Sequence, residues 1–101
     1  MSEMNSGNRG NAAAFKGIAD KLSTQYAQKN MAYGDSFGDS VQKYGLIAAL
    51  TRLSDKFNRA ENIILHPDIN VDDERLIDTL GDMASYCIMT IMQIEKDKEN
   101  K

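Results

Sequence analysis

Three groups of polar residues have types and spacings that suit chemistry on a phosphate group or a metal ion. The first is the segment Tyr33-Gly34-Asp35-Ser36, which precedes an apolar helical pattern. Glycine lets backbone N–H groups approach a ligand, and a helix N-terminus carries a partial positive charge that suits phosphate. The same residues also suit an ordinary turn with capping side chains. The spacing therefore leaves a phosphate cradle and an inter-helix turn as alternatives.

The second group is basic and lies at helical spacing. Arg52, Lys56 and Arg59 recur at intervals of four and three residues, so they share one helical face. Arginine can grip a phosphate with a planar fork and lysine adds a point charge. Asp55 lies within the group and can pair with either arginine. The alternative is a solvated face with weak ion pairs.

The third group consists of carboxylates. Asp78 and Asp82 are four residues apart, which places both on one stripe of an otherwise apolar helix. Buried carboxylates are costly unless they pair with a base or bind a metal ion. Asp55, Asp78 and Asp82 are therefore candidate magnesium ligands, and pairing with the basic group is the equal alternative.

Helices must position these groups, because apolar residues recur at intervals of three and four and no alternating strand pattern occurs. We expect helices over residues 12–29, 41–65 and 72–96, with a loop over residues 30–39. Asp39 or Ser40 is the expected N-cap of the second helix, and Asn70 or Asp72 that of the third. The predicted core of the second helix consists of Leu46, Leu50, Leu53, Phe57, Ala60 and Ile64.

These elements predict an all-α fold, a small bundle of three main helices. One domain is expected over residues 12–96, with a disordered polar tail over residues 1–11 and a charged tail over residues 97–101. The third helix is apolar over most of its circumference from Met83 to Ile94. A monomer of this size cannot bury that surface, so we expect a homo-oligomer to complete the bundle.

Composition limits the classes of partner. Of the 101 residues, 42% are hydrophobic and the formal net charge is −3, with no strongly basic block. Binding to duplex nucleic acid needs a cationic surface, so we do not expect it. No stretch is long and apolar enough to predict a membrane span, and the polar N-terminus does not resemble a secretory signal. We expect a cytoplasmic protein, in the host cytoplasm if a phage encodes it.

The three groups together resemble the nucleotide-modification-associated family, a domain of unknown function that is common in phages. The matching blocks, which lie between about Leu22 and Ile94, are Tyr33-Gly34-Asp35-Ser36-Phe37, Arg52-Leu53-Ser54-Asp55-Lys56-Phe57-Asn58-Arg59 and Asp78-Thr79-Leu80-Gly81-Asp82-Met83-Ala84-Ser85-Tyr86. That family is distantly similar to the all-α nucleoside triphosphate pyrophosphatases, the MazG-like group, whose glutamates and aspartates hold magnesium. This chain departs from their pattern because Thr79 stands where a carboxylate is expected.

Two main functions follow from the resemblance. In the preferred one the chain binds a nucleotide without turnover and needs no cofactor; a small phage oligomer of this type could sequester a nucleotide signal made by host immunity. Tyr33, Gly34, Asp35, Ser36, Arg52, Lys56 and Arg59 are then the expected ligand contacts. In the alternative it is a magnesium-dependent nucleotide pyrophosphohydrolase acting on the nucleotide pool. A third possibility is an interaction module without catalysis.

Overall fold

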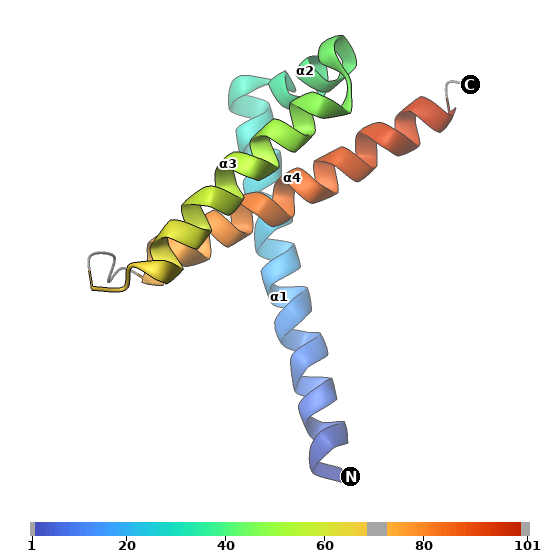
Figure 1. Ribbon diagram of the computed structural model, residues 1–101. Helices are drawn as coiled ribbons and strands as arrows, with labels where there is room; N and C mark the ends of the chain where they lie inside the picture. Colours follow the sequence, from blue (N-terminus) through green and yellow to red (C-terminus); the bar gives the residue numbers. More distant parts are fainter. Residues whose placement is uncertain (1, 69–72, 100–101) are drawn as a thin grey trace. The chain divides into compact units, whose positions relative to one another are not determined.

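The computed structural model describes residues 2–68 and 73–99, and over those residues it consists of four α-helices without a strand (Figure 1). The helices are α1 (Ser2–Tyr33), α2 (Ser36–Tyr44), α3 (Leu46–Leu65) and α4 (Asp73–Glu99). The all-α class predicted from the sequence is therefore confirmed. The chain divides into two compact units, Met1–Gly34 and Asp35–Lys101. The first contains α1 and the second contains α2, α3 and α4.

The first unit is a single long helix. Its apolar side chains are largely exposed, with 77% of the Phe15 surface and 63% of the Ile18 surface accessible. The helix ends at Gly34, whose φ of 74° is a left-handed conformation that favours glycine, and whose N–H donates to the Asn30 carbonyl at 2.9 Å. α1 includes residues 2–11, which lie in the tail that composition predicts to be disordered. The domain boundary at residue 12 stays a prediction.

α1 and α2 together occupy most of the segment that the sequence predicted as a loop, and α2 begins within it at Ser36. Its N-cap is Asp35, whose carboxylate accepts a hydrogen bond from the Gly38 N–H at 3.0 Å. A Cβ atom at Gly38 would collide with that carboxylate, so the close capping contact needs glycine here. The predicted loop over residues 30–39 and the predicted cap at Asp39 or Ser40 are therefore wrong. Helix continues to Tyr33 and resumes at Ser36.

Gly45 separates α2 from α3, where the sequence predicted one continuous helix over residues 41–65. Its φ is 83°, a left-handed value that most other residues adopt only with strain. The Gly45 N–H donates to the Val41 carbonyl and its carbonyl accepts from the Ala48 N–H, which closes one helix and opens the next. The described residues therefore contain one helix more than the three that were predicted.

α3 and α4 lie side by side and antiparallel, and α2 packs against both (Figure 1). The most buried side chains of α3 are Ala49, Ala60 and Ile63, and Thr79 of α4 is 2% exposed. The predicted core is wrong in part, because four of its six members are more than half exposed: Leu46, Leu50, Phe57 and Ile64. The true core stripe lies one position away from them on the helix.

This offset gives each helix two different flanks. On α3, the exposed Leu50 and Ile64 each follow a buried residue by one position, and Phe57 lies on the same side, seven residues from each. Arg52 and Arg59 each precede a core residue instead. Successive residues of a helix are about 100° apart, so these two sets lie on opposite sides of the core stripe. α4 follows the same pattern, with apolar residues after the core positions and carboxylates before them. Because the helices are antiparallel, the charged flanks share one face of the pair.

α4 begins at Asp73 and runs to Glu99, three residues beyond the predicted end. Lys96 and Lys98 lie in its last turn, where positive charge favours the helix dipole. The predicted caps Asn70 and Asp72 lie outside the described residues. Among the helices that the structure describes, none is long and apolar enough to cross a membrane.

Candidate functional site

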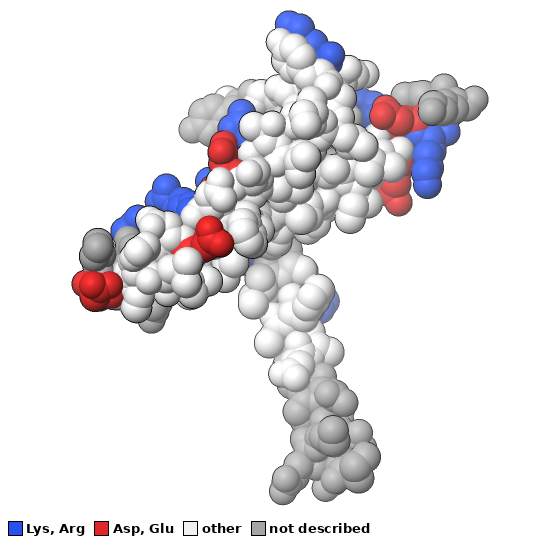
Figure 2. All heavy atoms as spheres, viewed as in Figure 1, with Lys and Arg blue, Asp and Glu red and all other residues white. Residues whose placement is uncertain are grey.

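The charged flank of α3 and Tyr86 of α4 form a basic cleft of about 380 Å³ in the second unit. Its walls are Arg52, Asp55, Lys56, Arg59 and Tyr86. The first four lie at spacings of three, one and three on α3, so one helix presents three cations and one carboxylate together. Figure 2 shows Lys and Arg atoms along one edge of the α3–α4 pair, with acidic atoms among them. The predicted basic group is thus gathered in one cleft.

An ion pair joins the two helices beside this cleft. The Lys56 Nζ atom lies 2.9 Å from the Asp82 Oδ2 atom, and the two side chains are 28% and 38% exposed. This contact realises the pairing alternative for Asp82 that the sequence left open. A lysine ammonium group has three donors, so one can bind Asp82 while others reach a ligand. The pair therefore holds Lys56 in place within the cleft and leaves donors of its ammonium group for a ligand, while the Asp82 carboxylate offsets part of its charge.

Among the described residues, the two arginines of the cleft lack an ion pair like that of Lys56. Arg52 and Arg59 are both exposed, and neither forms an ion pair with a carboxylate that the structure describes. The predicted pairing of Asp55 with these arginines is likewise absent among the described contacts. Both side chains are thus accessible to a ligand, with no ion pair to a carboxylate in the part of the chain that the structure describes. A phosphate entering the cleft would meet planar donors that need not first break a salt bridge.

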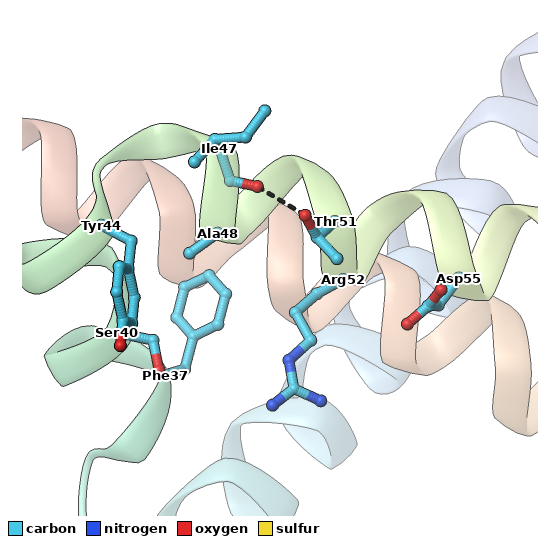
Figure 3. A pocket seen from close by; sticks show the side chains of 8 residues that line it. All are labelled: Phe37, Ser40, Tyr44, Ile47, Ala48, Thr51, Arg52 and Asp55. Atoms are coloured by element: carbon cyan, nitrogen blue, oxygen red, sulfur yellow. Dashed lines mark hydrogen bonds between the residues drawn. The ribbon is translucent and has the colours of Figure 1, made fainter.

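A second cleft of about 460 Å³ adjoins the basic one, and we call it the aromatic cleft (Figure 3). α2 contributes Phe37, Ser40 and Tyr44, and α3 contributes Ile47, Ala48, Thr51, Arg52 and Asp55. Arg52 and Asp55 therefore line both clefts. The rings of Phe37 and Tyr86 are in contact, with centroids 5.3 Å apart and an interplanar angle of 41°. This aromatic contact fixes α2 against α4 where the two clefts meet.

The predicted phosphate cradle is not assembled as one loop. Tyr33 and Gly34 belong to the first unit and Asp35 and Ser36 to the second, so the structure does not place the four as one site. Asp35 already caps α2 through the Gly38 N–H. A carboxylate at that helix end opposes a second anion there. Phosphate contact by these four residues stays a prediction.

The candidate metal ligands are also dispersed. Among the described residues, no three His, Cys, Asp or Glu side chains are grouped closely enough to hold a metal ion, so Asp55, Asp78 and Asp82 do not form one cluster. Thr79, which stands where a carboxylate was expected, is buried and donates its hydroxyl to the Arg75 carbonyl at 2.7 Å. Its side chain is thus committed to its own helix. Magnesium binding stays the alternative prediction.

The comparison with protein families bears on this site directly. Residues 29–94 match the model of the family described as nucleotide modification associated domain 1, which is well over half of the chain. The chain belongs to this family. The matched region contains every residue that lines the two clefts, and it begins seven residues after the boundary predicted at Leu22. No curated protein and no solved structure is similar enough to match.

Within this nucleotide modification associated domain, the sequence pattern did not predict the aromatic cleft. Phe37 entered only through the family resemblance, because it lies in the segment predicted as a loop. Tyr44 and Thr51 were not singled out, because both lay within one predicted continuous helix and the break at Gly45 was not foreseen. Tyr86 ends the third block of the family resemblance, and its spacing of four from Asp82 was a signal that it shares the carboxylate's flank. The basic group Arg52, Lys56 and Arg59 was predictable, because its spacing within one helix is enough to place the three side chains on one face.

Proposed function

We propose that this chain binds a nucleotide through its phosphate groups in the basic cleft and releases it chemically unchanged. The observation that carries the proposal is the convergence of Arg52, Lys56 and Arg59 on one cleft beside Tyr86. Membership of a nucleotide-associated family supports a nucleotide as the ligand. A chain with net charge −3 gathers this positive charge locally, which favours a small anion over a long polyanion.

The chemistry of the cleft supports binding better than hydrolysis. Its walls offer one carboxylate, Asp55, and the nearby Asp82 is engaged by Lys56. A magnesium-dependent hydrolase needs several carboxylates to hold the ion and orient water. With three cations and one carboxylate, the cleft suits neutralising a bound phosphate. Asp55 and Asp82 then orient the cations instead of holding a metal ion.

Binding without turnover would lower the concentration of free ligand. A nucleotide signal made by host immunity is the ligand that the resemblance to phage proteins suggests, and sequestration of such a signal is the role we propose for the whole molecule. Several copies per oligomer would raise the capacity for ligand in proportion to the number of clefts.

Calorimetry with adenosine, guanosine, cytidine and uridine triphosphates tests the proposal, each titrated with and without a magnesium chelator. We expect at least one nucleotide to bind, and its affinity to survive chelation, since protein cations supply the charge compensation. Affinity that disappears with the chelator would contradict the proposal and favour the metal-dependent alternative.

A further inference from the structure

We propose that the aromatic cleft is the subsite for the base and sugar of the bound nucleotide, with the phosphates extending along α3 into the basic cleft. This inference rests on the proposed function, because it takes a phosphate at the basic cleft as its starting point. It assigns a ligand orientation, with the base near α2 and the phosphates toward Arg59, and a ligand class, a nucleotide with two or more phosphate groups.

The first argument is continuity. Arg52 and Asp55 line both clefts, so the two hollows follow one stripe of α3 from Ile47 to Arg59. At about 1.5 Å per residue this stripe is about 18 Å long. The cationic part alone, from Arg52 to Arg59, extends over about 10 Å. A chain of phosphates can follow that row along its whole length.

The second argument is the change of chemistry along the stripe. The basic cleft is charged, while the aromatic cleft is lined by two rings, Phe37 and Tyr44, together with the aliphatic Ile47 and Ala48. A nucleotide has the same division, since its base offers an apolar face and its other end is anionic. Aromatic side chains bind bases by stacking, with little dependence on sequence. Figure 3 shows Arg52 extending from α3 on the side where Phe37 lies.

The third argument concerns the hydroxyl groups. Thr51 donates its hydroxyl hydrogen to the Ile47 carbonyl at 2.8 Å, drawn as the dashed line in Figure 3. With that hydrogen committed, the Thr51 oxygen offers only acceptor lone pairs to a ligand. A sugar hydroxyl or an exocyclic amino group is the matching donor. The half-buried Ser40 adds a second hydroxyl across the cleft.

The test compares a base-bearing ligand with its phosphate chain alone. The probes are 2-aminopurine riboside triphosphate, whose fluorescence falls when its base stacks, and inorganic tripolyphosphate. Tyr44→Ala removes a ring that is 63% exposed, so the fold should survive the change. Phe37→Leu, the second variant, keeps an apolar contact with Tyr86. Phe15→Ala removes an exposed ring of α1 that lines neither cleft and serves as the matched control.

We expect wild type and Phe15→Ala to quench the probe equally. Tyr44→Ala and Phe37→Leu should weaken its binding about fivefold to a hundredfold, the range of a lost stacking contact, and leave tripolyphosphate affinity unchanged. If both variants bound and quenched the probe like wild type while Arg59→Ala weakened it, the base would lie elsewhere and only this inference would be overturned. If wild type bound neither probe, the proposed function would fail as well.

Discussion

Lys56 links the fold to the proposed site, because its ammonium group pairs with Asp82 of α4 and also lines the basic cleft. Partly exposed ion pairs of this kind stabilise a protein by roughly 0.2–1 kcal/mol, so the pair matters more for orientation than for stability. It keeps a flexible side chain pointed toward the place where Arg52 and Arg59 converge. The arginines, which lack such a partner among the described residues, supply the more adaptable contacts.

Arg59 gives the first test at this scale. Arg59→Ala should weaken nucleotide binding by about 1–3 kcal/mol, the range for a lost charge-assisted hydrogen bond, and near its lower end because the side chain is exposed. Arg59→Lys should lose less, since it keeps the charge without the fork. Calorimetry measures both, with Lys21→Ala on α1 as a charge-matched control. Equal affinity in wild type, Arg59→Ala and Lys56→Ala would mean that this face is only solvated charge.

Asp82 separates the pairing role from the metal role. Asp82→Asn should lower the free energy of unfolding by roughly 0.2–1 kcal/mol, because it breaks a partly exposed ion pair. It should also loosen Lys56 and change nucleotide affinity whether or not magnesium is present. Chemical denaturation and calorimetry measure the two effects. The metal role would instead leave nucleotide binding largely intact and remove a magnesium-dependent turnover.

At the scale of the element, α2 is short and depends on its cap. Nine residues are too few for a stable isolated helix, so the Asp35–Gly38 contact and packing on α3 and α4 must hold it. Because α2 carries Phe37 and Tyr44, its position decides whether the aromatic cleft exists. A local capping contact therefore controls a binding surface.

A double-mutant cycle tests this dependence. Gly38→Ala should displace the Asp35 carboxylate and lower the free energy of unfolding, by about 0.5–2 kcal/mol for the lost cap. In an Asp35→Ala background the same change should be neutral or stabilising, since alanine favours a helix over glycine. Urea denaturation of the four proteins gives the coupling energy. Equal costs in both backgrounds would show that Gly38 acts independently of the cap.

The elements also explain which features the sequence could predict. Arg52, Lys56 and Arg59 were predicted together because spacing on one helix settles which side chains are neighbours. The core of α3 was predicted only in part, because two adjacent stripes are both apolar and only packing distinguishes Ile63 from Ile64. The short α2 was missed because Gly34 and Gly38 favour a loop in sequence, whereas Gly38 in fact admits the capping carboxylate.

At the scale of the whole molecule, the second unit leaves one apolar face uncovered. α3 presents Leu50, Phe57 and Ile64 on the flank opposite the basic cleft, each more than half exposed. On α4, the exposed Ile77, Leu80 and Ile91 each follow a core position and lie on the corresponding flank, which on an antiparallel pair is the same face. The exposed Ile88 lies further round α4 and extends the apolar surface away from α3. Contiguous apolar surface of this kind is rare on a monomer. We therefore keep the homo-oligomer as a proposal and assign this face to it.

Assembly through this face should leave the basic cleft open. Ile88→Glu and Phe57→Glu should release smaller species, because each buries a charge at the expected contact. Nucleotide affinity per chain should stay within about twofold, since neither residue lines a cleft. Light scattering coupled to size-exclusion chromatography measures the mass. An unchanged mass in both soluble variants would count against this interface.

The central claim is that a nucleotide is bound and not altered, and one measurement tests it most directly. The purified protein is incubated with the nucleotide panel and magnesium, separated from unbound ligand and heated, and the released compounds are identified by chromatography and mass spectrometry. Tight retention of a nucleotide and its recovery in unchanged form is the predicted result. Release of pyrophosphate or monophosphate that requires magnesium and disappears in Asp82→Asn would contradict it and identify a hydrolase.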